Sequence, residues 1–483
     1  MMVYYTMGFI ILAVLIILWV TITGVATFHI LLHKRDPRGA ALWLAMTGLL
    51  PFVGPLLYWT LGINRIKRSS AVRARRRSRP GWAHWRTEHR IDPNEGLYPE
   101  LESLMDSSGR ITNLPLLKGN TIEPLYEGNQ TFPAMLAAIG AAERSVNLST
   151  YILDRDAVGS RMISALCTAA HRGVEVRVLV DGHGTSRSAI AMARRLRGAG
   201  AMLSIFHPFF GLWVRRPSIN MRNHRKLLII DGRIGFTGGI NISSRHFLTP
   251  WKKVEPIRDI HFRVTGPVLE HMQAVFAEDW YASKGELLDS DEFLTQPESG
   301  GEALVRAVSS GPDEDLEKIY QLILGALRSA RDHVLIMTPY FIPDRALIQA
   351  LCSAVLAGVK VEILLPEKCD HPLVQGASMA YIPELIENGV KVLLIPPPFV
   401  HSKLMVVDGA WSLIGSANID PRSFRLNFEF DLEVYSREFA ARMLQYSKDM
   451  SSEGVLLSTE AMLARPLATR LLEGAVKIFS PYL

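Results

Sequence analysis

The sequence predicts an α/β protein made of two tandem α/β repeats with pseudo-twofold symmetry, preceded by an N-terminal two-helix transmembrane hairpin. Three observations lead to this fold class: two apolar runs fill residues 3–32 and 39–62, later residues alternate helical patterns with β-rich runs, and two long segments are similar to each other. The predicted boundaries are 1–64 for the hairpin, 65–115 for a basic juxtamembrane linker, 116–282 for the first repeat, 283–303 for a linker and 304–483 for the second repeat.

The composition sets limits on the class of protein. A chain of 483 residues is long enough for two or three domains with full cores. Its three cysteines, Cys167, Cys352 and Cys369, form neither a C-x-x-C pair nor an even framework. We therefore expect a reduced compartment, without structural disulfides or a cysteine zinc site.

The positive charge is confined to one end of the chain. The net charge is +6, but residues 1–90 hold 13 Lys/Arg and 2 Asp/Glu, so they carry +11 and the remaining residues carry −5. Proteins that bind nucleic acid usually spread positive charge over the domain that touches phosphates. The charge distribution therefore disfavours a nuclease and predicts no nucleic-acid partner.

The first apolar run, residues 3–32, exceeds the roughly 20 residues that span a bilayer core. No Lys or Arg precedes it, so it lacks the charged start of a signal peptide. The second run, residues 39–62, contains Pro51, Gly54 and Pro55, which a membrane helix tolerates as a kink. Together the runs predict a hairpin embedded in a membrane.

A basic segment follows the hairpin, with eight Lys/Arg and no acid in residues 65–79. The loop at 33–38 holds three positive residues and one acid, which argues more weakly in the opposite direction. The positive-inside rule thus places the globular part in the cytoplasm. The same segment can also contact anionic lipid head groups.

The rest of the chain contains an internal repeat. Residues 138–181 and 323–365 both read as helix, strand, turn, helix, Gly and strand. "GVEVRVL" at 173–179 matches "GVKVEIL" at 358–364, and "ALC" recurs at the same spacing. Helical patterns that alternate with β-rich runs predict parallel strands in an α/β sheet.

Each repeat also contains a strand pattern with two ionisable residues. "HRKLLIIDGRIGFTGGIN" fills 224–241, and "HSKLMVVDGAWSLIGSAN" fills 401–418. Alternate side chains of a strand share a face, so the His and Lys of each motif should point the same way. An acid and a Gly follow in a turn, and then a small-residue turn ends in Asn. The residues concerned are His224, Lys226, Asp231, Gly239 and Asn241 in one repeat, and His401, Lys403, Asp408, Ser416 and Asn418 in the other.

This set of side chains suits a phosphoryl group. Small residues let backbone amides approach an anion, and Asn adds a side-chain donor. If the two motifs face each other, one His can attack and the other can protonate the leaving oxygen, while Lys and Asn hold the remaining oxygens. A single His-x-Lys motif is weak evidence, but two at matching places favour a functional site.

The strands that follow the motifs add two carboxylates. Asp259 in "RDIHFRV" aligns with Glu429 in "FEFDLEV". A carboxylate that accepts a hydrogen bond from an imidazole fixes its tautomer and favours its charged form. We therefore predict that Asp259 and Glu429 orient the two histidines.

The paired motifs resemble the signature of the phospholipase D superfamily. "KRDPRGAALWLAMTGLLPFVGPLLYWTLG", "RDIHFRVTGPVLEHMQAVFAEDW" and "GSANIDPRSFRLNFEFDLEVY" are similar, more narrowly, to bacterial cardiolipin synthases. The resemblance runs from the hairpin almost to the C-terminus. It implies that both repeats are phospholipase D-like and that the protein is a multi-pass protein of the bacterial inner membrane with its catalytic part in the cytoplasm.

The resemblance also implies a reaction without metal or organic cofactor. One His forms a phosphohistidine with phosphatidylglycerol and releases glycerol, and a second phosphatidylglycerol then displaces the His to give cardiolipin. Carried over, His224 is the nucleophile and His401 the acid/base, an order that the near-symmetry leaves open. Asp231 and Asp408 would brace their turns, and the predicted phosphate ligands are Lys226, Lys403, Asn241, Asn418, Gly239 and Ser416. The expected partners are phosphatidylglycerol and other anionic membrane lipids, whereas the oligomeric state stays open.

Three alternatives use the same residues. A phospholipase D-type hydrolase or another phosphatidyltransferase would differ only in the acceptor, which the motifs do not reveal. A membrane-attached nuclease conflicts with the charge distribution. A lipid-binding scaffold without activity conflicts with two complete motifs.

Two further segments have open roles. The first repeat contains a long insert, "HPFFGLWVRRPSINMRN" at 207–223, where the second has only "PPPFV". Its Phe209, Phe210 and Trp213 either pack as a loop or enter the lipid interface. The C-terminal segment 460–483 can form an amphipathic helix, for which we predict packing on the core.

Overall fold

The computed structural model describes residues 2–34, 37–62, 89–91, 96–185, 189–206, 221–248, 255–288 and 299–480. It divides into two compact units, one of Met1–Ile66 with Leu212–Met221 and the other of Lys67–Gly211 with Arg222–Leu483. The predicted basic segment 65–79 and the aromatic residues of the insert lie outside the described residues.

The N-terminal unit begins with α1 (Met2–His33), whose stretch Thr6–His33 is the one described helix long and apolar enough to cross a membrane. The second apolar run is not a single helix. It forms α2 (Pro37–Leu49), α3 (Val53–Leu57) and a π-helical turn at Tyr58–Gly62. The predicted two-helix hairpin therefore holds for its first helix only.

The break in the second apolar run has a local cause. Pro51 has no N–H for the helical ladder, and the next residue, Phe52, adopts a positive φ of 61°. The short helices still fold back on α1. One contact that shows this is the hydrogen bond of 2.7 Å between His29 Nδ1 and the Tyr58 hydroxyl.

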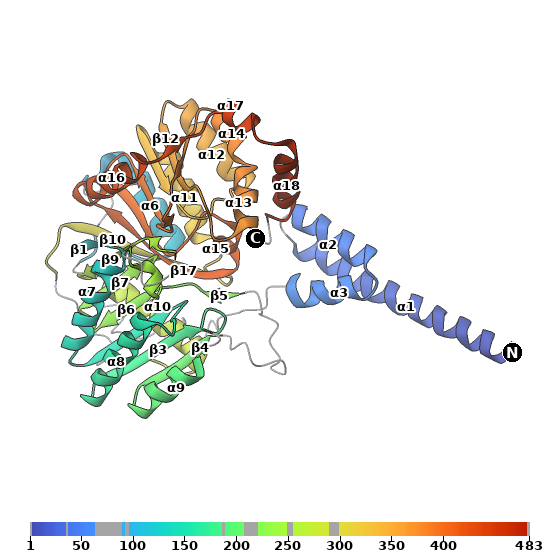
Figure 1. The fold of residues 1–483 in the computed structure, drawn as a ribbon, viewed down its shortest axis with the longest axis horizontal. Coiled ribbons are helices and arrows are strands. Elements are labelled where there is room, and N and C mark those ends of the chain that lie inside the picture. Colours follow the sequence, from blue (N-terminus) through green and yellow to red (C-terminus); the bar gives the residue numbers. More distant parts are fainter. Residues whose placement is uncertain are drawn as a thin grey trace. The chain divides into compact units, whose positions relative to one another are not determined.

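The larger unit, Lys67–Gly211 with Arg222–Leu483, contains one 16-stranded mixed sheet (Figure 1). Its first half comprises β1 (Leu117–Tyr126), β2 (Ser145–Thr150), β3 (Glu175–Asp181), β4 (Met202–Phe206), β6 (Leu227–Ile230), β7 (Ile234–Gly238) and β9 (Ile260–Thr265). Its second half comprises β10 (Ala303–Ser310), β11 (His333–Met337), β12 (Lys360–Pro366), β13 (Lys391–Ile395), β15 (Leu404–Val407), β16 (Trp411–Gly415) and β17 (Asn427–Tyr435).

The strand order shows the pseudo-twofold symmetry directly. Outward from the central antiparallel pair β1–β10, the first half runs β1-β9-β7-β6-β2-β3-β4 and the second runs β10-β17-β16-β15-β11-β12-β13. Corresponding strands occupy corresponding places, and the short β18 (Val455–Leu456) pairs with β13 at the edge. The predicted tandem α/β repeat is confirmed.

The predicted parallel pairing applies to part of each half. β2, β3 and β4 are parallel, as are β11, β12 and β13. The strands that carry the motifs join antiparallel, β6 beside β2 and β15 beside β11. Helix crossovers connect the parallel strands, whereas short turns join β6 to its antiparallel neighbour β7 and β15 to its antiparallel neighbour β16.

Helices connect the strands in matching places. The first half has α7 (Glu127–Ala141), α8 (Ala157–His171), α9 (Ala189–Gly198) and α10 (Leu269–Lys284). The second has α11 (Lys318–Ser329), α12 (Arg345–Leu356), α13 (Pro372–Met379), α14 (Ile382–Glu387) and α16 (Arg437–Ser451). Asp156 and Asp344 cap α8 and α12 by accepting backbone N–H bonds of 2.9 Å, so the repeat extends to the helix starts.

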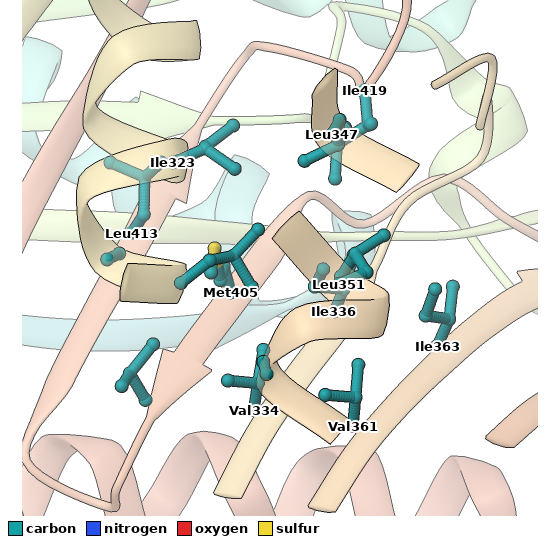
Figure 2. Packing of buried hydrophobic residues seen from close by; sticks show 14 of the residues in the cluster. Ile323, Val334, Ile336, Leu347, Leu351, Val361, Ile363, Met405, Leu413 and Ile419 are labelled. Carbon is teal, nitrogen blue, oxygen red and sulfur yellow. The ribbon is translucent and has the colours of Figure 1, made fainter. Parts of the chain in front are cut away.

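Each half has its own apolar core. Figure 2 shows the second core, where Val334 and Ile336 of β11 lie beside Val361 and Ile363 of β12. Leu351 of α12 covers these strands. The residues of this core alternate along each strand because successive side chains of a strand point to opposite faces of the sheet. The rigid sheet then fixes the strands from which the site is built.

The C-terminal segment departs from its prediction. It forms α17 (Thr459–Leu463) and α18 (Leu467–Ile478). Leu467, Leu471 and Leu472 are each between 65% and 68% exposed, whereas Val476 packs against the second core and α18 packs on α13, so the predicted packing on the core holds for one side of the helix only. Its leucines face away from the unit to which they belong.

Candidate active site

Each motif begins directly after a short strand that pairs with a strand of the other half. In the first half, β5 (Arg222–Asn223) pairs in parallel with β17 of the second half. In the second half, β14 (Phe399–Val400) pairs in parallel with β8 (Ile257–Arg258) of the first half. Each half thus sends one two-residue strand across the pseudo-twofold axis to pair with the other half. We call this arrangement the strand exchange.

The two histidines follow directly on the exchanged strands. The His224 N–H donates to the Phe428 carbonyl over 2.9 Å, and the His401 N–H donates to the Arg258 carbonyl over 2.7 Å. The backbone of each His is thus held by the backbone of the opposite half. The prediction that His and Lys lie within a strand is wrong in detail, because β6 and β15 begin one residue after each Lys.

The exchange brings each predicted carboxylate against an imidazole. Glu429 Oε2 lies 3.0 Å from His224 Nδ1, and Asp259 Oδ2 lies 2.8 Å from His401 Nδ1. Both carboxylates are fully buried. Each His therefore has a partner from the other half, a detail that spacing along the sequence does not predict.

The two carboxylates differ in their other contacts. Glu429 also accepts from Ser416 Oγ over 2.6 Å and from Asn427 Nδ2 over 3.0 Å. Burial opposes its ionisation, but His224, Lys226 and Ser416 outweigh burial and hold the pKa of Glu429 below its usual value. Burial raises the pKa of Asp259, only partly offset by the positive charge of Lys403. Glu429 is therefore the more firmly ionised of the two.

The two lysines are buried beside the histidines. Lys226 Nζ donates to the His224 carbonyl over 2.8 Å, and Lys403 Nζ lies 3.0 Å from His401 Nδ1. Burial lowers the pKa of Lys226 to about 7 and that of Lys403 to about 8, against the pull of the buried carboxylates. An entering anion would favour the charged form of both.

Burial also lowers the pKa of both histidines. The field of Glu429 opposes this shift at His224, whereas Lys403 and Lys226 add to it at His401. Neutral imidazoles that donate from Nδ1 to a carboxylate leave Nε2 unprotonated. The site therefore holds two imidazoles with a free lone pair near neutral pH.

The two motif aspartates act on the backbone. The Asp231 carboxylate accepts N–H bonds of 2.8 to 3.0 Å from residues 143–145, at the start of β2. The Asp408 carboxylate accepts three bonds of 2.9 Å from residues 331–333, at the start of β11. Both residues have positive φ, 53° and 51°, which short polar residues tolerate in a turn. Each aspartate thus ties its motif turn to the start of the neighbouring strand, which is the bracing role predicted for it.

The predicted free amides at Gly239 and Ser416 are already bonded. The Gly239 N–H donates to the Ile260 carbonyl over 3.2 Å, and the Ser416 N–H donates to Asp431 Oδ1 over 2.8 Å. A Cβ at Gly239 would lie 2.3 Å from Asp259 Oδ1, so only Gly leaves room for that carboxylate. Both positions thus serve the carboxylate of their own half and offer no amide to a phosphate.

The two motif asparagines occupy equivalent pockets. The Asn241 N–H donates to His246 Nε2 over 3.2 Å, and the Asn418 N–H donates to Ser423 Oγ over 3.1 Å. Within the described residues, Oδ1 of each Asn is buried without a hydrogen-bond partner. Rotation of an amide exchanges its oxygen and nitrogen, so each side chain can offer an N–H donor at that place. Such orphaned groups suit a ligand oxygen.

Sequence reasoning missed several residues around the histidines. The Tyr151 ring packs edge-on against His224 at 4.9 Å, and the Tyr340 ring lies 6.3 Å from His401. The Tyr340 hydroxyl donates to Asp370 over 2.8 Å. The centre of the His246 ring lies 6.5 Å from the centre of the His401 ring. Only His246 had a usable signal, since it stands five residues past a motif Asn.

Within the described ranges, no three His, Cys, Asp or Glu side chains gather as a metal ion would require. The site's own polar groups are cations, amides and neutral imidazoles around two carboxylates. That composition suits an anionic ligand.

A duplicated mixed α/β fold with two crossed His–carboxylate pairs defines a phospholipase D-like enzyme. Residues 135–280 and 323–450 match the family model described as cardiolipin synthase, PLD-like domain. Residues 11–62 match the phospholipase D-nuclease N-terminal model. The chain belongs to the cardiolipin synthase, phospholipase D-like family, and it is a phosphatidyltransferase.

Named relatives cover nearly the whole chain. It is 32% identical over 475 residues to a cardiolipin synthase of Geobacillus kaustophilus, covering 94% of this chain and 90% of that one. It is 35% identical over 446 residues to cardiolipin synthase A of Pseudomonas entomophila, covering 89% and 90%. Together with helix α1, these bacterial relatives indicate membrane association.

A solved structure supports the fold independently. The phosphatidylserine synthase of Haemophilus influenzae superposes with a TM-score of 0.62 at 16% identity, over 79% of this chain and 100% of that one. At this identity the likeness bears on the fold alone.

Proposed function

We propose that the protein makes cardiolipin by joining two molecules of phosphatidylglycerol, with release of glycerol. The crossed pairing of His224 with Glu429 and of His401 with Asp259 is the observation that carries the proposal. Two imidazoles in one site supply both a nucleophile and an acid/base for exchange at phosphorus. The relatives named as cardiolipin synthases supply the choice of substrate.

In the first step, His224 Nε2 attacks the phosphorus of one phosphatidylglycerol. A P–N bond forms, the P–O bond to the head-group glycerol breaks, and the glycerol oxygen takes a proton from His401. The products of this step are phosphatidyl-His224 and free glycerol. A protonated His401 is needed only while substrate is bound, when the phosphate charge offsets the burial that lowers its pKa.

In the second step, the head-group hydroxyl of another phosphatidylglycerol attacks the same phosphorus. His401 takes the hydroxyl proton, the new P–O bond forms and the P–N bond breaks. Cardiolipin leaves, His224 is neutral again and His401 has regained the proton that it gave to glycerol. The balance is two phosphatidylglycerol molecules for one cardiolipin and one glycerol.

The assignment of His224 as nucleophile rests on Glu429. An ionised carboxylate with two further donors, Ser416 and Asn427, holds the proton of His224 at Nδ1 and leaves Nε2 unprotonated. Asp259 has a raised pKa and is a weaker anion beside His401. His401 is therefore better suited to exchange a proton during the cycle.

The lysines and asparagines of both halves would bind the non-bridging oxygens. Lys226 and Lys403 lie beside the two histidines, and the orphaned amide ends of Asn241 and Asn418 need a partner. In a buried site, such fixed donors stabilise charge on phosphorus without having to reorganise. Asp231 and Asp408 would keep the motif turns in place.

We further propose that the protein crosses the bacterial inner membrane more than once and keeps its catalytic unit in the cytoplasm. Eight basic residues at 65–79 favour that orientation. Protease added to inside-out vesicles should then cut the catalytic unit, and protease added to right-side-out vesicles should not. The reverse pattern would contradict the orientation.

Product analysis tests the reaction. The full-length protein in mixed micelles receives labelled phosphatidylglycerol, and cardiolipin, glycerol and phosphatidic acid are measured together. We expect equal amounts of cardiolipin and glycerol, and neither from His224→Ala or His401→Ala. Phosphatidic acid as the main product would mean that water is the acceptor and would replace this proposal by a hydrolase.

A further inference from the structure

Helix α18 packs Val476 against the core but turns its other large apolar side chains away from the unit that carries it. Leu467, Leu471 and Leu472 are 65–68% exposed, Ile478 is 66% exposed and Phe479, just after the helix, is 54% exposed. Spacings of four residues (467 to 471) and seven residues (471 to 478 and 472 to 479) place them on one side of the helix. Contiguous exposed apolar surface of this kind marks an interaction site.

Two of the three charged residues of α18, Glu473 and Lys477, face inward instead. Glu473 is only 8% exposed, and its Oε1 lies 2.7 Å from Nη1 of Arg465. Lys477 Nζ donates to the Ala380 carbonyl over 3.2 Å and lies 4.1 Å from the centre of the Tyr381 ring. The polarity of the helix is thus the reverse of what a water-exposed helix shows.

Other surface helices of the same unit have the usual polarity. Helix α16 buries Phe439, Met443 and Met450 and exposes Arg442. Helix α12 buries Leu347, Ile348 and Leu351. The outward apolar face is therefore a property of α18 and calls for an apolar cover.

We propose that α18 lies on the surface of the bilayer and buries this face among anionic phospholipids. Of its three charged residues, the acid Glu473 is turned inward, whereas Arg470 stays exposed beside the leucines. The outward side therefore offers apolar groups and a cation but no carboxylate, as interfacial helices do. The same chain carries α1, which holds this unit at a membrane.

Docking of α18 would also act on the His401 side of the site. Helix α18 packs on α13, which begins just after Asp370 and His371. The Tyr340 hydroxyl donates to Asp370, and the Tyr340 ring lies near His401. A helix fixed at the lipid surface would thus hold one flank of the site close to where phospholipid head groups lie.

Depth-dependent quenching tests the location. The full chain, with Cys167, Cys352 and Cys369 replaced by Ser, receives Leu471→Cys, carries an environment-sensitive fluorophore there and is reconstituted in nanodiscs that contain phosphatidylglycerol. Leu356→Cys on α12 is the matched control, because Leu356 is 82% exposed on the same unit. We expect spin-labelled lipid to quench the probe at 471 several-fold more than the probe at 356, and aqueous iodide to quench it less.

Two results would overturn the proposal. If iodide reaches 471 as readily as 356, the face is in water. If neither quencher reaches 471, protein covers it, either the N-terminal helices or a second copy of the chain.

Activity supplies an independent readout. Serine at 467, 471 and 472 together should lower cardiolipin formation on vesicles about tenfold and change it less than about twofold in detergent micelles. Leu356→Ser should change neither. Equal loss in both media would contradict membrane docking, while cardiolipin formed in micelles would leave the proposed function intact.

Discussion

From His224 to Phe247 and from His401 to Phe424, the two halves of the site run in step, at a spacing of 177 residues. Both halves send a two-residue strand across the axis, brace a turn with an aspartate and satisfy the backbone of an asparagine at the same place. The backbone frame of the site is therefore duplicated closely.

The side chains around the histidines are less alike. His224 faces Glu429, which three donors hold ionised, whereas His401 faces Asp259, whose pKa is raised. His246 supports one asparagine and Ser423 the other. A symmetric frame thus places its two imidazoles beside carboxylates of unequal charge, so the two histidines are not chemically equivalent.

Alanine at either histidine gives the largest expected effect. His224→Ala and His401→Ala should each lower cardiolipin formation more than about 1,000-fold, because one removes the nucleophile and the other the proton donor. A phosphatidyl ester of p-nitrophenol separates the two roles, since nitrophenolate leaves without a proton. His401→Ala should still release nitrophenolate in a burst, and His224→Ala should not.

The covalent intermediate formed in the burst also tests which of the two histidines is the nucleophile. Labelled lipid should stay on His401→Ala protein after denaturation in alkali, where phosphohistidine survives. Label on His224→Ala instead would exchange the two roles.

Substitution of the two carboxylates, Glu429 and Asp259, should lower activity by different amounts. Glu429→Gln removes the anion that fixes the nucleophile, and we expect a loss of about 100-fold. Asp259→Asn should cost about tenfold, because Asp259 is the weaker anion. Steady-state kcat measures both, and thermal unfolding checks that the variants fold. A double variant with unchanged activity would show that neither carboxylate orients a histidine.

The repeat and its motifs were predictable because they are local. Each His-x-Lys motif, its aspartate turn and its asparagine lie within 18 residues, and the helix–strand pattern around them has a clear period. The partner of each histidine was not predictable. Glu429 stands 205 residues from His224, and only the exchange of β5 and β14 brings them together.

Two other predictions failed because composition and periodicity do not show every detail of a segment. Composition marks residues 39–62 as apolar enough for a membrane, but it does not show that the helix breaks near Pro51 and Phe52. Periodicity marks α18 as amphipathic, but it does not show which side faces the protein. In the structure the inward side carries Glu473, which pairs with Arg465, and Val476, which packs on the core.

The lysines predict an asymmetric pH dependence. Both bind phosphate when charged, so kcat/KM should fall once pH exceeds the pKa of about 7 at Lys226, by up to about tenfold per unit. Below pH 7 both lysines are protonated and this loss is absent. In Lys226→Arg the guanidinium stays charged, so the fall should begin near the pKa of about 8 at Lys403. Lys403→Arg should leave the fall near pH 7, and identical profiles for all three proteins would contradict a role of these lysines.

The smallest expected effect comes from making the halves alike at His246. Burial lowers its pKa to about 3, so it is neutral and its Nε2 acts as an acceptor for the Asn241 N–H. His246→Ser supplies the acceptor that Ser423 supplies in the other half, and we expect activity within about threefold of wild type. His246→Ala leaves that buried N–H without an acceptor, which costs about 1–3 kcal/mol of unfolding free energy, readable as a lower Tm. If His246→Ser lost activity as strongly as Glu429→Gln while keeping its Tm, His246 would take part in the reaction beside His401, and the inequality of the two halves would extend beyond their carboxylates.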